Sequence, residues 1–269
     1  MSYLTGLDQW TPLVSSSDIT ATIISVGVSV PLLTIGLHVD VVFDEVILGR
    51  IETPSNSAIA KGTTVTTSFE PVPMPVPANA HDAFSAAIKA LLSTESANLQ
   101  LLGKIDASFS IPLLPVNPIL SVGLDVTNEV KGFNGLLDVT FVSLVSNTPD
   151  ESNKKQTIAL KVNVKSPSII SIKLGDILFN IAGPAEPIGT ATLKDVVLKL
   201  GDNFLTAIVV IDLSLAGAAE FVSGLETADA TVTLTGTGSS PANPVILSAI
   251  QSLKINFVIP QKFTPMTTL

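Results

Sequence analysis

Cysteine is absent from this chain of 269 residues, and aromatic and charged residues are scarce. A chain without cysteine forms no disulfide, has no cysteine nucleophile and binds no zinc through thiolates. Charged residues make up 14% of the sequence and aromatic residues 5%, whereas about 25% of the residues in an average globular protein are charged. The remaining bulk is aliphatic, so the composition indicates a chain that can bury a large apolar core.

Basic residues are also few. Lysine and arginine together number 14 against 23 aspartates and glutamates, which gives a formal net charge of −9 at pH 7. No run of basic residues interrupts this acidic balance, and contacts with a phosphate backbone depend on such residues. We therefore expect no nucleic-acid partner.

The residues that usually carry catalysis or bind metals do not form a recognisable set. His38 and His81 are the only histidines, and a zinc site needs three or four clustered ligands. No Gly-x-Ser-x-Gly turn offers a serine nucleophile. Asp40, Asp44 and Glu45 lie close together but lack the spacing of a calcium loop. We predict a non-enzymatic protein with no catalytic residue, no metal ligand and no cofactor.

Short segments with apolar residues at every second position dominate the chain. Residues 171–181, 230–238 and 253–260 show this alternation, and Gly, Pro and Asn separate them. Such segments are typical of antiparallel strands with one buried face. In residues 171–181 the apolar phase shifts at Gly175, which indicates an irregularity inside that strand.

Two segments have helical spacing instead. Residues 79–93 place Phe84, Ile88, Leu91 and Leu92 on one helical face, and residues 216–225 place Phe221 one turn before Leu225. The sequence therefore predicts an all-β protein with two short helices.

The strand and helix pattern occurs twice along the chain. The order of strands, glycine turn, strands, short helix and further strands is similar in both halves. The residue pairs that correspond are Pro31 and Pro167, Gly62 and Gly201, Gly103 and Gly236, and Pro112 and Pro260. This repetition predicts a tandem duplication, with one copy in residues 1–130 and the other in 131–269. Asn134-Gly135 predicts a turn at the entrance of the second copy.

Two glycine-containing stretches invite comparison with phosphate-binding loops. Gly201-Asp202-Asn203 is a short turn signal, and residues 236–240 read GTGSS. No lysine and no convincing helix follows the second stretch. We interpret it as a plain loop, and we expect position 201 to need a backbone conformation that glycine adopts at least cost.

The second half carries a family resemblance. The segments GFNGLLDVTFVSL, IALKVNVKSPSIISIKLGDILFNI, IGTATLKDVVLKLGDNF and TVTLTGTGSSPANPVILSAIQSLKINFVIP resemble a fungal family of uncharacterised membrane-anchored proteins. That family is similar to the group-2 late-embryogenesis-abundant (LEA-2) and water-stress (WHy) domains. The resemblance implies two tandem antiparallel β-sandwiches, related to immunoglobulin-like folds, each with one short helix. It also implies a lumenal (vacuolar or secretory) or cell-surface location, with membrane proximity through a segment absent from this chain.

The resemblance and the apolar composition suggest two functions. The first is a binding or transfer module for a lipid or another apolar ligand. The second is a structural or assembly module that associates with itself or with other proteins through sheet edges and apolar patches.

The candidate ligand-binding residues are apolar side chains that would face water in a fold of two packed sheets unless another layer covers them. Residues 208–211 are apolar without a break, so one face of that strand needs a cover beyond the core. A short helix that splays the sheets is a way to line a groove for an acyl chain. The candidates for such a groove are Phe84, Ile88, Leu91, Ile208 and Val210. The alternative is that these residues only fill the core.

Overall fold

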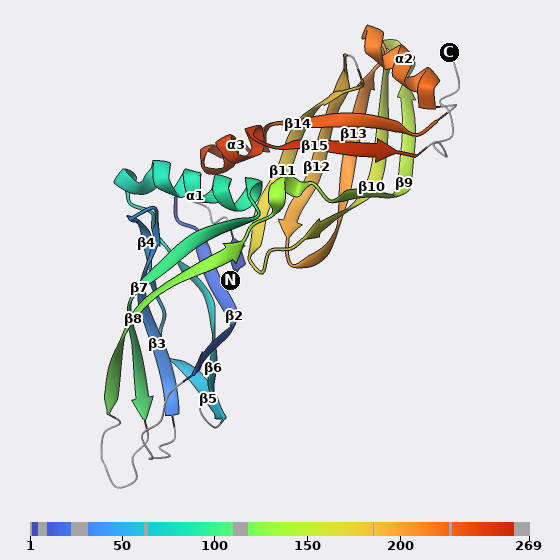
Figure 1. Ribbon diagram of the computed structural model, residues 1–269. Helices are drawn as coiled ribbons and strands as arrows, with labels where there is room; N and C mark the ends of the chain where they lie inside the picture. Colours follow the sequence, from blue (N-terminus) through green and yellow to red (C-terminus); the bar gives the residue numbers. More distant parts are fainter. Residues whose placement is uncertain are drawn as a thin grey trace. The chain divides into compact units, whose positions relative to one another are not determined.

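The computed structural model describes residues 2–4, 10–22, 32–61, 64–109, 118–184, 186–225 and 228–260. Over these residues the chain is mostly β, as the alternating pattern predicts, and the strand pairings are antiparallel. The chain divides into two compact units (Figure 1). Unit 1 comprises Met1–Phe84 and Asn98–Val130, and unit 2 comprises Ser85–Ala97 and Lys131–Leu269.

Unit 1 contains the strands of the first half of the chain. These are β1 (Ser2–Leu4), β2 (Leu13–Thr22), β3 (Leu32–Phe43), β4 (Val46–Glu52), β5 (Asn56–Lys61), β6 (Thr64–Pro73) and most of β7 (Ser96–Phe109) and β8 (Ile119–Lys131). They are hydrogen-bonded in the order β1-β2-β6-β5-β3-β7-β8, and β4 pairs with the far end of β3.

Unit 2 contains the remaining strands. These are β9 (Val139–Asp150), β10 (Lys155–Ser166), β11 (Ser171–Ala182), β12 (Pro187–Leu198), β13 (Gly201–Asp212), β14 (Ala230–Ser240) and β15 (Lys254–Ile259). Their order is β9-β10-β13-β12-β11-β14-β15, and the two outermost strands, β9 and β15, are also in contact.

The two units therefore share one strand order. Each strand of unit 2 has a counterpart in unit 1, and β4 and β5 together occupy the place of the continuous β12. The break between β4 and β5 falls at residues 53–55, where Thr53 keeps contact with β3. Its amide donates to Leu37 O and its hydroxyl accepts from Leu37 N, both at 3.0 Å.

The sequence repeat can be followed only in part. Gly103 and Gly236 lie on the counterpart strands β7 and β14. Pro31, Gly62 and Pro112 lie outside the described residues.

The core of unit 2 follows from the alternation in its strands. In β11, Ile172 and Leu174 are buried, and the buried positions then change phase to Ile177, Phe179 and Ile181. The pairing with β12 shifts on both sides of Gly175, whose φ of 71° lies in the left-handed region. The predicted irregularity is therefore a local bulge that lets one strand keep its apolar residues on the core side.

Among the described residues three α-helices accompany the strands: α1 (His81–Ser93), α2 (Ala216–Leu225) and α3 (Pro244–Gln251). Short 3₁₀ turns occupy Ala78–Ala80, Asn134–Leu136 and Glu151–Asn153. The two predicted helices are confirmed. None of the helices in the described residues is long and apolar enough to cross a membrane.

The expectation of one short helix in each copy is wrong for unit 2, because α3 follows β14. The Asn243 side chain accepts a hydrogen bond from Val245 N at 3.0 Å, and Pro244 occupies the first turn. These are the usual signals of a helix start. Val245, Ile246, Ala249 and Ile250 are its buried residues.

The predicted turn at Asn134-Gly135 is confirmed as a 3₁₀ turn, and it is held against the end of α1. Asn134, Gly135 and Leu136 have φ values of 51°, 66° and 56°. The amides of Phe133 and Asn134 donate to the carbonyls of Leu91 and Thr94, at 2.7 and 3.1 Å. Phe133 and Leu136 are fully buried, so this turn is an anchored part of unit 2.

Candidate functional site

Phe84, Ile88 and Leu91 share one face of α1, as their spacing predicts, and all three are buried. Leu92 beside them is fully buried as well. These side chains are therefore core residues in this structure.

Ile208 and Val210 are half-buried on one face of β13. The opposite face carries Ala207, Val209 and Ile211, and only this second face lines the interior of unit 2. The structure thus brings Phe84, Ile88 and Leu91 together on α1 and Ile208 and Val210 together on β13. The apolar cavity inside unit 2 is lined by neither group, and Val210 borders a hollow on the surface of that unit.

The interior of unit 2 holds a small apolar cavity. All of its strands and α2 contribute to the lining, which includes Phe179, Phe221 and Phe257 and no polar side chain. Its volume is about 40 Å³, whereas pockets for drug-sized ligands measure about 300–1,000 Å³. The cavity as it stands is too small for an acyl chain.

Two wider hollows lie on the surface of unit 2. One, of about 340 Å³, lies at the ends of β10 to β13 and is lined by Lys155, Val210 and Asp212 among others. The other, of about 460 Å³, lies beside α2 and is lined by Glu186, Glu220 and Asp229 among others. Within the part of the chain that the structure describes, no group of three or more His, Asp or Glu side chains is placed to hold a metal ion.

The stretch Gly201-Asp202-Asn203 is a structural turn. Gly201 has a φ of 87°, as expected for a position that favours glycine. The buried Asn203 side chain accepts from Lys199 N at 2.9 Å and donates to the carbonyls of Val164, Lys199 and Gly201. Its polar atoms are thus engaged in holding the turn.

The interpretation of residues 236–240 as a loop is wrong, because they form the end of β14. The Ser239 hydroxyl donates to Pro241 O at 3.0 Å and accepts from Asn243 N at 3.1 Å. These contacts join β14 to the cap of α3, so Ser239 has a structural role.

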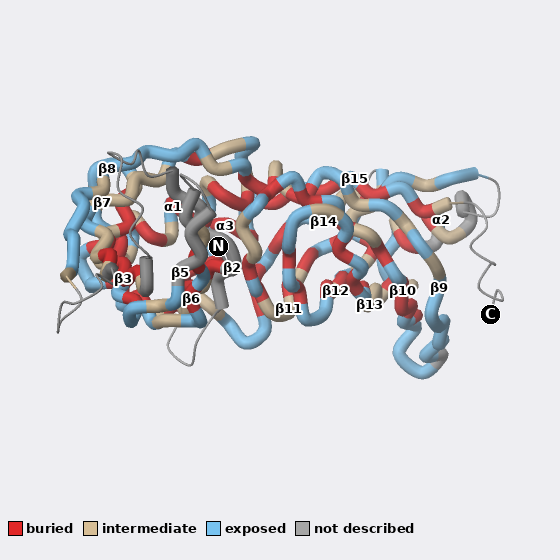
Figure 2. The backbone as a smooth tube through the Cα atoms, turned by 90° about the horizontal axis from the view of Figure 1, so that it is seen from below, coloured by how far each residue is buried: buried red, intermediate tan, exposed pale blue. Residues whose placement is uncertain are grey.

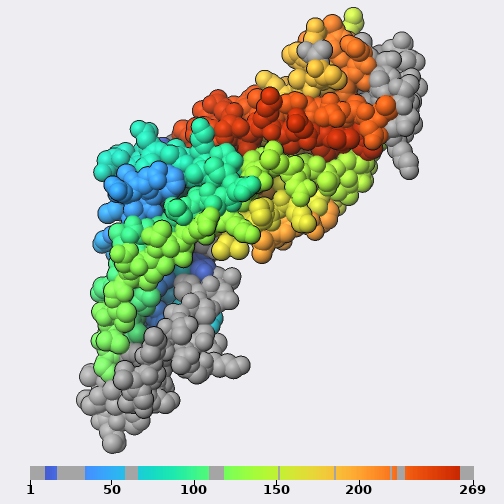
Figure 3. Space-filling model, viewed as in Figure 1, coloured from blue at the N-terminus to red at the C-terminus, as the bar shows by residue number. Residues whose placement is uncertain are grey.

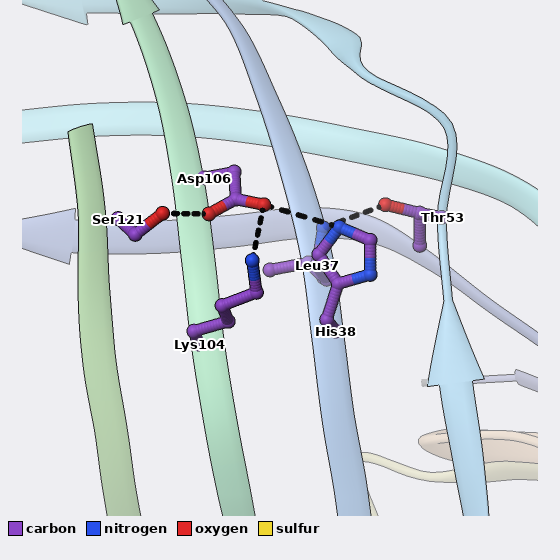
Figure 4. Close-up of polar contacts among 6 residues, drawn as sticks. All are labelled: Leu37, His38, Thr53, Lys104, Asp106 and Ser121. Atoms are coloured by element: carbon purple, nitrogen blue, oxygen red, sulfur yellow. Dashed lines mark hydrogen bonds and ion pairs between the residues drawn. The ribbon is translucent and has the colours of Figure 1, made fainter. Parts of the chain in front are cut away.

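A polar cluster lies on the outward face of β3, β7 and β8 in unit 1 (Figure 4). Asp106 is at its centre: it accepts from the Ser121 hydroxyl and from Lys104 Nζ at 3.0 Å, and His38 Nε2 lies 3.3 Å away. In a catalytic triad the imidazole stands between the hydroxyl and the carboxylate. Here the carboxylate stands between the other two, so the imidazole has no access to the serine proton.

The electrostatics of this cluster also agree with a structural role. The Ser121 hydroxyl, followed by Lys104, holds the pKa of Asp106 below its ordinary value of 3.8. A carboxylate with a lowered pKa is a weak proton acceptor at neutral pH.

The second histidine makes a ring contact. His81 stacks on Trp10 with ring centroids 3.5 Å apart and planes 3° from parallel. This stacking joins the start of α1 to the chain before β2 within unit 1.

The exposed apolar residues of β8 are the feature that sequence reasoning missed. Ile119 is 70% exposed, Leu120 54% and Val122 49%, and Val126 is exposed as well. The tube in Figure 2 is pale blue over most of this strand, and Figure 3 shows part of it in green on the surface.

Alternation in β8 did not reveal this exposure. Leu120, Val122, Leu124 and Val126 occupy every second position, as in a strand with a buried face. The pattern shows on which face of the strand each side chain lies, but it does not show whether another layer of the protein covers that face.

Comparison with known proteins gives a partial match. Residues 48–181 match the model of a family described as a protein of unknown function, DUF3712. The matched segment runs from β4 of unit 1 to β11 of unit 2. A search of curated protein sequences found no significant match. The description of this family names no activity, so the similarity assigns none to the chain.

Proposed function

We propose that the chain is a non-enzymatic binding module that takes up an extended strand of protein at β8. The observation that carries this proposal is the exposed apolar side chains of a long outermost strand. β8 spans 13 residues, whereas strands usually have about 5–6. Among the described residues its only hydrogen-bonded neighbour is β7.

An edge of this kind has the chemistry for strand addition. The side of β8 away from β7 offers backbone N–H and C=O groups, which hydrogen-bond to an added strand. The exposed side chains at alternate positions provide apolar contacts for the incoming residues. Proteins usually blunt such edges with charges, proline or a covering loop, and residues 119–124 of β8 contain no charge.

We also propose that the two units are copies of one LEA-2-like, immunoglobulin-like β-sandwich. The shared strand order supports this proposal, as does the helix between the fifth and sixth strand positions in both halves, with β4 and β5 counted as one position. The same order of strands in two halves of one chain is expected of a duplicated domain.

Binding of a lipid or another apolar ligand is the second candidate function. The observation in its favour is the cavity in unit 2, whose lining is entirely apolar. It ranks second because the cavity, with a volume of about 40 Å³, is too small for a chain of methylene groups unless the strands separate. Native mass spectrometry with an organic extract of the same sample tests it: a lipid in both would raise this candidate above strand binding.

The experiment for strand binding uses a fluorescent synthetic peptide of sequence ILSVGLDVTNEVK, which is β8 itself. We expect saturable binding at protein concentrations where the chain alone is monomeric, and no binding of a peptide with the same residues in shuffled order. Val122→Lys should weaken binding at least tenfold, or about 1.4 kcal/mol, because its ammonium would oppose apolar contacts.

Val258→Lys is the matched control. Val258 is 51% exposed on β15, the last strand in the order of unit 2, close to the 49% of Val122 on β8. If both variants weaken the peptide equally, or if the shuffled peptide binds as well as the ordered one, strand addition at β8 is wrong.

A further inference from the structure

We propose that β8 pairs with β8 of a second copy of this chain, antiparallel, about a two-fold axis at Gly123. This inference rests on the proposed function and identifies the partner strand. It follows from the exposure of β8, from the sequence of the strand read in both directions, and from the open space at Gly123.

The first observation is that in unit 2 another strand lies beside the counterpart of β8. In unit 2 the counterpart of β8 is β15, whose inward residues Ile255, Phe257 and Ile259 are buried. There the next element beside β15 is another strand, β9. The fold thus accommodates a strand beside this position, and in unit 1 the residues Leu120 and Val122 remain exposed.

The second observation is the self-complementary sequence of β8. With the axis at Gly123, Leu120 lies opposite Val126 of the second copy and Val122 lies opposite Leu124. Each pair occurs twice, so all four apolar residues of one face meet apolar partners. On the other face Ser121 lies opposite Asp125, a pairing without like charges. Apolar cross-strand pairs stabilise a sheet, and like charges opposite each other destabilise it.

Neighbouring registers are less favourable. An axis at Asp125 places that carboxylate opposite its own copy. An axis at Leu124 places Leu120 opposite Asn128. Shifting the axis by one residue toward Val122 leaves Val126 opposite Pro118, which has no amide hydrogen for the ladder.

The third observation is the surroundings of Gly123. A Cβ added there would meet no atom within 4 Å, and Gly123 is not among the glycines with a positive φ. Glycine is therefore not required at this position by its own chain. A side chain here would project from the face of the sheet that carries Ser121 and would leave the single chain unstrained, so a substitution at Gly123 tests the pairing without disturbing the monomer.

The absence of cysteine makes a cross-linking test direct. The residue on a two-fold axis lies opposite itself, about 4.5–5.5 Å away between Cα atoms, within the range of a disulfide. Gly123→Cys should therefore oxidise to a covalent dimer of twice the chain mass. Thr127→Cys should not, because its own copy would lie eight residues away, or about 27 Å.

A mixture of two cysteine variants tests which residues of the two β8 strands face each other. Ile119→Cys and Thr127→Cys should each stay monomeric alone but cross-link when mixed, since these positions face each other. Val258→Cys on β15 is the control for collisional disulfides. Adding Val122→Lys to Gly123→Cys should abolish the dimer, and far-UV circular dichroism and Trp10 fluorescence check that each variant is folded.

The outcomes separate this inference from the proposed function. Cross-linking of Gly123→Cys at the level of Val258→Cys, with the β8 peptide still bound by the wild type, overturns pairing between copies and leaves strand binding standing. Strongest cross-linking at another position of β8 overturns the axis at Gly123. Loss of both peptide binding and cross-linking removes the proposed function as well.

Discussion

Unit 2 buries the apolar face of its last strand, whereas unit 1 exposes the apolar face of the strand at the same place in the order. In β15, Ile255 and Phe257 are buried. In β8, Leu120 and Val122 are about half exposed. The strand order is the same in both units, so connectivity alone does not decide whether a core is closed. That depends on what lies against the final strand.

The largest expected effect comes from truncating one residue in each of these strands. Phe257→Ala should destabilise unit 2 by about 3–5 kcal/mol, because a large buried side chain is removed next to an existing cavity. Val122→Ala should cost less than about 0.5 kcal/mol in the monomer, because an exposed side chain loses few contacts. Chemical denaturation at low protein concentration, followed by circular dichroism, measures both.

The location of each effect can be assigned. The chain has a single tryptophan, and Trp10 stacks within unit 1, so its fluorescence follows unit 1 while circular dichroism follows both units. If Val122→Ala lowered the free energy of unfolding about as much as Phe257→Ala does, β8 would be covered in solution even at low protein concentration. The two units would then not differ in the burial of their last strands.

Two glycines give the next contrast. Gly201 has a φ of 87°, which a β-branched side chain opposes, so Gly201→Val should destabilise unit 2 by about 1–2 kcal/mol. Gly123→Ala should instead stabilise the monomer by about 0.4–1 kcal/mol, because it restricts the unfolded chain at an unstrained, open position. Unfolding midpoints of the two variants should therefore move in opposite directions. Unchanged stability of Gly201→Val would contradict the turn at that position.

The sequence predicts the regular parts of this molecule well. Alternation locates the strands, helical spacing locates α1 and α2, and the phase shift in residues 171–181 locates the bulge at Gly175. These features depend on residues close together in the chain, which is why pattern and turn chemistry suffice. The start of α3 was also within reach, since Asn243 and Pro244 precede an apolar stripe.

The candidate sites were harder to predict, because exposure depends on contacts between distant residues. The run 208–211 suggested a surface in need of a cover, yet its residues divide between the interior and the opposite face of β13. Asp106 and Ser121 are 15 residues apart and meet only because β7 and β8 are neighbours. No periodicity in the sequence contains that information.

The smallest expected effects are those of two carboxylates, one in each unit. The pKa of Asp106 is lowered first by the Ser121 hydroxyl and then by Lys104, and the pKa of Asp176 is lowered first by Lys194 and then by the Asp195 amide. A carboxylate with a lowered folded pKa contributes stability that is complete above the unfolded value of about 4. That contribution disappears as the pH falls through the folded pKa.

Asp106→Asn and Asp176→Asn should therefore lower the thermal midpoint at neutral pH, and the difference from the wild type should shrink as the pH falls below about 4. The two units should differ in salt dependence. The leading partner of Asp176 is the cation of Lys194, whose attraction salt screens, while the leading partner of Asp106 is a neutral hydroxyl. Added salt should thus reduce the effect of Asp176→Asn more than that of Asp106→Asn. Equal loss in both would mean that Lys104, and not Ser121, dominates the cluster in unit 1.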